Sequence, residues 1–196
     1  MPNQDKLVNS MSAVVRAFLS IDIADQVLVS RISEIQQQLN PEGAKMKIVE
    51  SDNIHFTIRF FGDTPMERIE EMRNCLGQIK IVPFEIKIQG VGAFPNKRRP
   101  RVVWIGVTEN SQKVVDLKLK ADELLTEIGY KMEREKFKPH ATIARVRNVK
   151  SPDLMVRNLE ELADRSIGSM IVKSLSMKKS TLTSSGPIYE TLWMVE

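Results

Sequence analysis

The sequence has few of the residues that form disulfides or metal sites, and it has no long apolar segment that could span a membrane. Its 196 residues include one cysteine, Cys75, which excludes an internal disulfide and any zinc site built on cysteines. No apolar run approaches the roughly 18 residues that a membrane-spanning helix needs. The N-terminal segment is polar and lacks the apolar stretch of a secretory signal. We therefore expect a cytoplasmic chain that does not associate with a membrane.

Glycine-rich phosphate loops are absent as well, because neither G-x-G-x-x-G nor G-x-x-x-x-G-K occurs. Neither sign of charge dominates: 29 Lys and Arg against 25 Asp and Glu give a net charge of +4. Such a balance permits an anionic partner without identifying one. Hydrophobic residues make up 42% and charged residues 28%, which is typical of a globular chain that buries its own core. No feature of the sequence requires a protein partner.

Hydrophobic periodicity divides the chain into interleaved strands and helices. Period-two alternation predicts strands at 15–23, 45–49, 54–61, 84–91, 102–107, 138–146, 170–178 and 188–195. Helical spacing predicts helices over 28–39, 65–79, 114–128 and 152–163, the second with Thr64 as N-cap and Pro65 at its first position. Trp104 and Trp193 fall in strand patterns and are expected in the core. Residues 1–13 show no periodicity and are expected to be a disordered lead-in. The whole pattern favours an α+β fold with antiparallel or mixed sheets.

The two histidines of the chain occur in the same short pattern. His55 begins the tetrapeptide HFTI and His140 begins HATI, so Thr57 and Thr142 each follow a histidine by two positions. Residues i and i+2 of a strand point to the same face, so each strand presents one imidazole and one hydroxyl together. The apolar residues between them face a core. A strand of this kind in each half of the chain indicates an internal duplication. If the halves pack as pseudo-symmetric lobes, the two histidines can face each other across a cleft.

Two opposed imidazoles suit acid–base chemistry at a phosphorus atom. Histidine exchanges protons near neutral pH, so one ring can act as a base while the other acts as an acid. The hydroxyls of Thr57 and Thr142, with an arginine, would hold the non-bridging oxygens. Acyl transfer fits less well because no serine or cysteine nucleophile stands out. Two histidines also leave a zinc shell incomplete, so we expect neither a metal nor a cofactor.

The paired motifs, with Arg16-Ala17-Phe18 near the start, resemble those of the two-histidine (2H) phosphoesterase superfamily, in particular its RNA 2′,3′-cyclic phosphodiesterase branch, historically called 2′-5′ RNA ligase. Supporting segments are RAFLSID (16–22), HFTIRFFGD (55–63), GVGAFPNKRRPRVVWIGV (90–107), KFKPHATIARV (136–146) and GPIYE (186–190). The resemblance implies one bilobal domain over 14–196. It would have two pseudo-symmetric lobes, each an antiparallel β-sheet backed by helices, around a central cleft.

The resemblance also implies an activity. His55 would be the general acid and His140 the general base acting on water, and the substrate would be RNA or a nucleotide ending in a 2′,3′-cyclic phosphate, opened to a 2′-phosphomonoester without a metal. Two alternatives stay open: ATP-independent 2′-5′ RNA ligation at the same site, and a non-catalytic module that binds nucleotides or RNA. The presence of both histidines and both threonines favours the enzyme, because binding alone needs no paired acid and base.

Two arginines near the motifs are further candidates. Arg145 follows His140 by five positions and would point away from it on a regular strand, yet it matches an arginine of the family. A β-bulge would turn it back toward the site, where it would bind the substrate phosphate. Arg59 follows His55 by four positions and should share its face, with a salt bridge at the rim as the alternative interpretation.

The loop that follows Phe94 carries the cations Lys97, Arg98 and Arg99. One interpretation is a solvated hairpin tip whose prolines fix its shape. The other is an RNA-binding patch at the edge of the cleft, with Phe94 stacking on a base. The sequence does not separate the two.

Overall fold

The computed structural model describes residues 13–184 and 186–196 as an α+β fold. Its elements are β1 (Val14–Asp22), α2 (Gln26–Gln37), β2 (Ala44–Ile48), the 3₁₀ turn η1 (Ser51–Asn53), β3 (His55–Pro65), α3 (Met66–Leu76), β4 (Phe84–Phe94), β5 (Val102–Val107), α4 (Ser111–Glu127), β6 (His140–Val149), α5 (Pro152–Glu161), β7 (Ser166–Val172), β8 (Leu175–Leu182) and β9 (Pro187–Val195). The predicted lead-in lies outside the described residues apart from Ala13.

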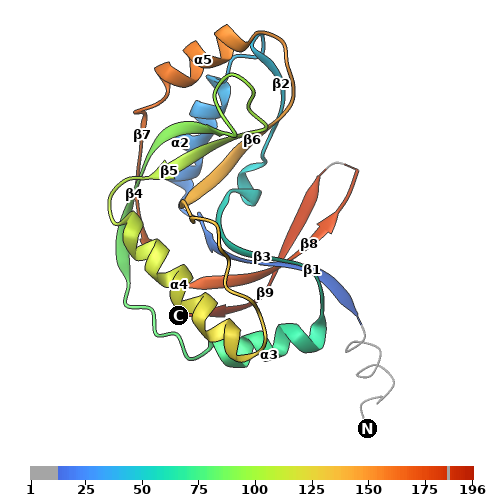
Figure 1. The fold of residues 1–196 in the computed structure, drawn as a ribbon. Coiled ribbons are helices and arrows are strands. Elements are labelled where there is room, and N and C mark those ends of the chain that lie inside the picture. The colour runs from blue at the N-terminus through green and yellow to red at the C-terminus, as the bar shows by residue number, and fades with distance from the viewer. Residues whose placement is uncertain (1–12, 185) are drawn as a thin grey trace.

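The strands form one antiparallel sheet of two halves, in the order β7-β4-β5-β6-β3-β1-β8-β9, with β2 paired to β6. At its centre β3 meets β6 through the pair Phe56–Ala141. We call β3, β1, β8 and β9 the first half-sheet, and β6, β5, β4 and β7 the second half-sheet. Figure 1 shows them as the two arms of a C-shaped molecule. The predicted fold of two similar antiparallel lobes is confirmed, with their sheets joined at the central strands.

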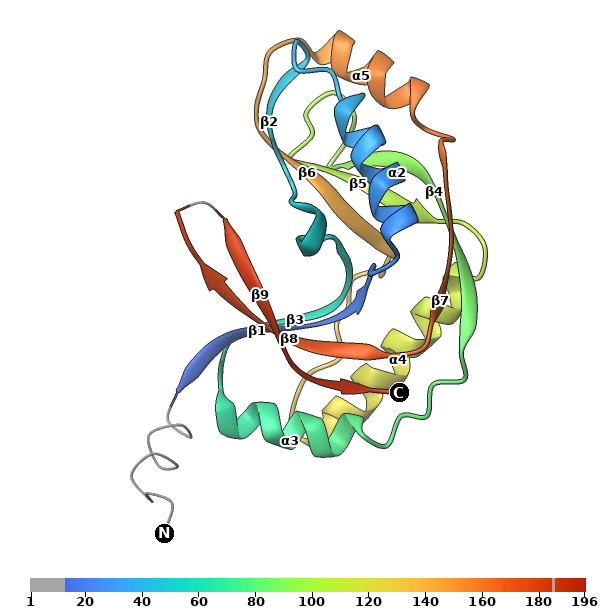
Figure 2. The same cartoon turned by 180° about the vertical axis from the view of Figure 1, so that it is seen from behind.

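Helices α2 and α4 each pack on the lobe opposite to the strand that precedes them in the chain. Helix α2 follows β1 of the first half-sheet but packs on β6 and β7 of the second. Helix α4 follows β5 of the second half-sheet but packs on α3, beside the first. Both views show this exchange, with α2 against β5 and β6 and with α4 beside α3 (Figures 1 and 2). The exchange binds the lobes together around the central pair of strands.

The core lies on the face of the central strands opposite the histidines. Phe56 and Ile58 of β3 are 1% and 2% exposed, and Ala141 and Ile143 of β6 are fully buried. Burial of a large apolar side chain contributes about 1.5–3 kcal/mol, so this face holds both strands firmly in place. The His and Thr side chains therefore project from a rigid surface. No helix in the described part of the chain is long and apolar enough to cross a membrane.

Two predicted element boundaries are wrong. The second helix begins at Met66, with Pro65 as its N-cap, because the pairing of β3 with β1 continues as far as Val14 and Pro65. Thr64 therefore belongs to β3, and its hydroxyl donates to the carbonyl of Gly62 at 3.1 Å. The single strand predicted at 170–178 is two strands, β7 and β8. The chain leaves the second half-sheet after β7, which pairs with β4, and enters the first with β8, which pairs with β1 and β9.

Candidate active site

The register of the central strands brings the two motifs together. Because Phe56 lies opposite Ala141 in an antiparallel pair, His55 falls beside Thr142, and Thr57 beside His140. The two histidines then occupy diagonal positions on one face, which lie about 7–8 Å apart in a regular sheet. His55 and His140, which are far apart in the sequence, therefore lie close together on one face of the central strands.

Both imidazoles are oriented by the same backbone contact. His55 donates from Nδ1 to the carbonyl of Asn53 at 2.8 Å, and His140 donates from Nδ1 to the carbonyl of Lys138 at 2.7 Å. A carbonyl only accepts, so Nδ1 carries the hydrogen in each ring and the lone pair of the neutral imidazole is on Nε2. Nε2 of His55 lies 3.0 Å from Oγ1 of Thr57.

Aromatic side chains support each ring on its own lobe. Phe18 stacks on His55 with ring centroids 4.8 Å apart, and Tyr189 of β9 meets the same ring edge-on at 5.3 Å. His140 contacts Phe94 at 5.0 Å and Trp104 at 6.1 Å. Trp104 is only half-buried because it borders the site, so its predicted place in the core is wrong.

Trp193, by contrast, is 6% exposed and lies in the core, as predicted. Phe94 lies beside Trp104, with ring centroids 5.2 Å apart. Its predicted stacking on a base stays a prediction.

A bulge in β6 turns Arg145 toward the site. The pairing of β6 with β5 shifts between Thr142 and Ala144, which leaves Ile143 as an extra residue. Ile143 and Ala144 are both buried, and the alternation of faces restarts one position later. Arg145 therefore lines the same pocket as Thr142. This is the re-aiming that the match to the family arginine requires.

The equivalent bulge in β3 removes Arg59 from the site. The pairing of β1 with β3 shifts between Arg59 and Thr57, so Ile58 and Arg59 both face the core. Arg59 is 7% exposed and pairs with Asp122 of α4 at 2.6 Å, and it also donates to the carbonyl of Lys131 at 2.7 Å. Its predicted place on the face of His55 is wrong, because that prediction assumed a regular strand.

Burial governs the ionisation of His55. Loss of solvent around the ring lowers its pKa from 6.5 to about 4, and the positive charges of Lys178 and Arg145 act in the same direction. The hydrogen bond to Asn53 and the charge of Asp22 oppose this shift. His55 is therefore neutral near pH 7 in the unliganded protein.

A cavity of about 420 Å³ opens beside the motifs, a size typical of small-molecule sites. The residues that line it are Arg16, Phe18, Lys47, Ile48, Val49, Glu50, Asn53, His55, Thr57, Phe60, Thr142, Arg145, Ser180, Leu182, Gly186, Pro187 and Tyr189. It extends from His55 toward the β8–β9 hairpin and β2. His140 does not line it and lies on the second half-sheet beside Phe94 and Trp104.

Three polar residues of this cavity, Arg16, Lys47 and Tyr189, are among those to which sequence reasoning assigned no role. Arg16 and Tyr189 lie in the segments RAFLSID and GPIYE, so the resemblance held a signal for both. Lys47 is the cross-strand partner of Arg145, which only the pairing of β2 with β6 reveals.

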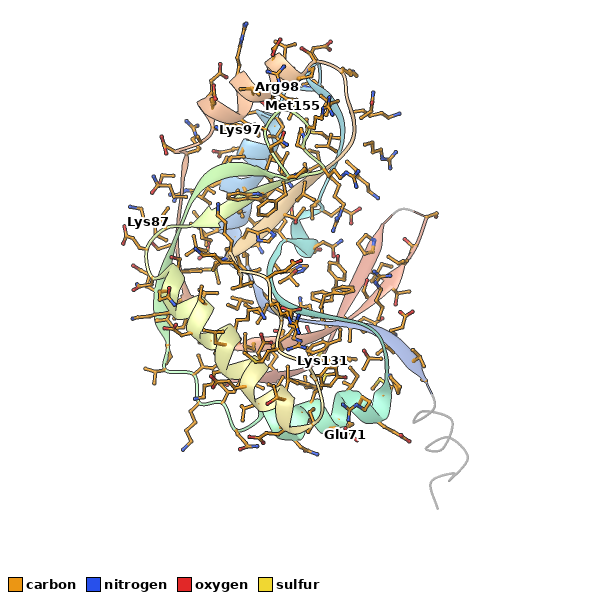
Figure 3. All side chains as sticks on the ribbon, viewed as in Figure 1. Glu71, Lys87, Lys97, Arg98, Lys131 and Met155 are labelled. Atoms are coloured by element: carbon orange, nitrogen blue, oxygen red, sulfur yellow. The ribbon has the colours of Figure 1, made fainter. Side chains whose placement is uncertain are left out.

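The basic loop faces helix α5. Arg98 pairs with Asp153 at 3.0 Å and Lys97 with Glu160 at 3.8 Å, and both cations lie at that helix in Figure 3. The backbone N–H of Arg99 donates to the side chain of Asn96 at 2.9 Å. RNA binding by this loop stays a prediction.

Comparison with known proteins agrees with this geometry. The family model described as LigT like Phosphoesterase matches the chain twice, over 23–104 and over 105–189. Each match contains one of the two histidine motifs, which supports the predicted internal duplication.

Two curated relatives are similar over most of their length. The protein named RNA 2′,3′-cyclic phosphodiesterase from Methanothermobacter thermautotrophicus is 40% identical over 177 residues, which cover 89% of this chain and 95% of the relative. The protein of the same name from Aeropyrum pernix is 36% identical over 169 residues, which cover 86% and 96%.

Solved structures show the same fold. E. coli LigT complexed with 3′-AMP superposes with a TM-score of 0.75 at 20% identity, covering 93% of this chain and 99% of that one. TT0787 of Thermus thermophilus gives 0.72 at 23% identity, covering 92% and 96%. The family model matches both halves of the chain, each with its histidine motif, and the curated relatives are similar over most of their length. This chain therefore belongs to the LigT-like phosphoesterase family.

Proposed function

We propose that this chain hydrolyses RNA 2′,3′-cyclic phosphate ends to 2′-phosphomonoesters by a metal-independent acid–base mechanism. The observation that carries the proposal is the matched pair His55 and His140, diagonal on adjacent strands, each with Nδ1 fixed by a carbonyl two residues earlier. The curated relatives named RNA 2′,3′-cyclic phosphodiesterase support the choice of substrate.

The reaction needs one proton accepted and one donated. His140 takes a proton from water at Nε2 as the water oxygen bonds to phosphorus. The bond from phosphorus to O3′ breaks, and His55 gives its Nε2 proton to the departing O3′. The products are a 2′-phosphomonoester and a 3′-hydroxyl, and the histidines return to their starting states by proton exchange with solvent.

The position of the cavity supports this division of roles. The ribose carries the leaving O3′, so the nucleoside must lie on the side of the general acid while water attacks from the opposite side. The cavity opens at His55, whereas His140 lies outside its lining, against Phe94 and Trp104. A nucleoside seated in that cavity brings O3′ to His55 and leaves His140 to the water.

Three side chains are suited to holding the phosphate oxygens. Thr57 and Thr142 flank the histidines on the same face, and Arg145 lines the cavity beside them. Hydrogen bonds from hydroxyl groups and a guanidinium stabilise the negative charge that accumulates on the non-bridging oxygens in the transition state.

The low pKa of His55 fits a proton donor once substrate is bound. A phosphodiester brings a negative charge beside Nε2, which favours the imidazolium and opposes the effect of burial. Burial then makes this proton readily transferable to O3′.

The test is hydrolysis of an oligonucleotide that ends in a 2′,3′-cyclic phosphate, with the position of the product phosphate identified by NMR. We expect a 2′-phosphate, a bell-shaped dependence of rate on pH, and full activity in excess EDTA. His55→Asn and His140→Asn should each lower kcat about 10²-fold or more with little change in product binding. Loss of activity on chelation, or a 3′-phosphate product, would contradict the proposal.

A further inference from the structure

The cavity carries more positive charge than the proposed reaction uses. Its lining, within the described residues, has three cationic side chains, Arg16, Lys47 and Arg145, against the single carboxylate of Glu50. Lys47 and Arg145 are direct cross-strand partners, and like charges placed opposite each other are unfavourable in a sheet. A pocket of this kind is suited to an anionic ligand with more than one charged group.

Arg16 lies at a fixed distance from the two histidine motifs, which the strand register gives. In the β1–β3 ladder Thr57 lies opposite Ser20, and Phe60 lies opposite Phe18. Phe60 is therefore two register positions from Thr57, about 7 Å along the sheet. The guanidinium of Arg16 lies over the Phe60 ring at 5.0 Å from its centroid. A shift of this size corresponds to about one sugar-phosphate unit of an RNA strand.

Arg16 is available to bind an anion. It is exposed, and no ion pair or hydrogen bond joins it to a carboxylate anywhere in residues 13–184 and 186–196, although Asp63 is its cross-strand partner. Phe60 is 47% exposed at the cavity wall and keeps the guanidinium in place through its ring face. Tyr189 connects this end to the centre: burial raises the pKa of its phenol, and the charges of Arg145 and Arg16 oppose that rise.

We propose that Arg16, held on the ring of Phe60, binds the 5′-phosphate of the nucleotide whose cyclic phosphate lies between the two histidines. In an RNA strand this group is the phosphodiester to the preceding nucleotide, so the chain prefers strand ends to free nucleoside cyclic phosphates. The inference rests on the proposed function, because it takes the phosphate of a nucleotide as the occupant of the histidine pair.

Two product analogues test the contact between Arg16 and the 5′-phosphate. Adenosine 2′-phosphate and adenosine 2′,5′-bisphosphate differ only in the 5′-phosphate, and their affinities for the full chain are measured by calorimetry. We expect the wild type to bind the bisphosphate about tenfold or more tightly, as a charge-assisted hydrogen bond to phosphate provides. Arg16→Gln should bring the two affinities within about twofold of each other.

Matched variants separate a local contact from net charge. Arg73→Gln removes the same charge from the outer side of α3, where Arg73 pairs with Glu70, and should leave the ratio of affinities as in the wild type. Phe60→Leu keeps an apolar side chain but removes the ring beneath Arg16, and should lower the ratio by a smaller factor than Arg16→Gln. Equal affinities in the wild type, or an equal effect of Arg73→Gln, would overturn the inference.

A kinetic comparison separates this inference from the proposed function. The rate of hydrolysis is measured for adenosine 2′,3′-cyclic phosphate with and without a 5′-phosphate. Hydrolysis of both at the same kcat/KM, with equal binding of both products, overturns the role of Arg16 and leaves the proposed function intact. A clear calorimetric preference without any hydrolysis overturns the proposed function and supports the anion site.

Discussion

The ring of His55 has a fixed orientation, and its surroundings disfavour the charged imidazolium form. The carbonyl of Asn53 fixes its tautomer, Phe18 stacks on its ring, and burial holds its pKa at about 4. Near neutral pH the unliganded ring is neutral, and the substrate's negative charge favours its protonation. In the proposed reaction, His55 therefore becomes charged when substrate binds rather than in the empty site.

This shift predicts how stability depends on pH. The pKa of His55 is about 4 in the folded chain and 6.5 in the unfolded chain, so between these values the unfolded state binds more protons. The free energy of unfolding should therefore fall as the pH drops from 6.5 toward 4, by about 3 kcal/mol from this residue, with no contribution above 6.5.

Urea titrations of the wild type and His55→Asn at about pH 7 and about pH 4.5 measure this contribution, because the other titrating groups cancel in the difference between the proteins. The wild type should lose more stability than the variant on acidification. Parallel losses in the two proteins would show that His55 is not buried as described.

At the scale of elements, one extra residue three positions after each histidine restarts the alternation of faces in both central strands. The bulge at Ile143 in β6 exposes Arg145 to the cavity, and the bulge at Ile58 in β3 buries Arg59 against Asp122. The position five residues after each histidine is then Arg145 in one lobe and Phe60 in the other. This difference in sequence places the guanidinium of Arg145 at one part of the cavity and the ring beneath Arg16 at another.

The ion pair behind β3 should be important for stability. Asp122→Ala removes the carboxylate shared by the buried cations Arg59 and Lys118, which keep the carbonyl of Lys131 and the carboxylate of Glu133, and should cost about 3–5 kcal/mol in urea unfolding. Glu109→Gln, which breaks the exposed pair with Lys87 on the outer surface, should cost less than about 1 kcal/mol. Similar costs for the two variants would show that the Arg59 pair is solvated, and would reopen its role at the site.

At the scale of the molecule, the exchange of helices couples the lobes. The half-sheets meet at one residue pair, which alone would allow them to unfold separately. Helix α2 covers the second half-sheet, however, and Gln36 within it donates to the carbonyls of Val49 and Ile143 at 2.8 and 3.0 Å. Helix α4 reaches back to the first half-sheet through Asp122. Either lobe would expose a large apolar surface if the other unfolded.

The chain offers one tryptophan in each half-sheet to test this coupling, Trp193 in β9 and Trp104 in β5. Fluorescence of Trp104→Phe follows the first half-sheet, and that of Trp193→Phe follows the second. We expect each fluorescence transition in urea to coincide with the circular dichroism of the same variant, as in a two-state process. Two separated transitions would mean that the lobes are independent units.

The sequence by itself determined most of the strands, the faces of the two motifs and the chemistry that two histidines allow. Alternation with a period of two depends only on local backbone geometry, so His55 and Thr57 had to share a face wherever the strand lay. Tertiary structure determined the β-bulges and the path of the chain between the lobes, which local backbone geometry does not specify. Pairing with β5 and β1 created the bulges that expose Arg145 and bury Arg59, and the passage from β7 to β8 carried the chain into the other lobe, where Tyr189 completes the cavity. These features arise from contacts between residues far apart in the chain, and no periodicity in the sequence records them.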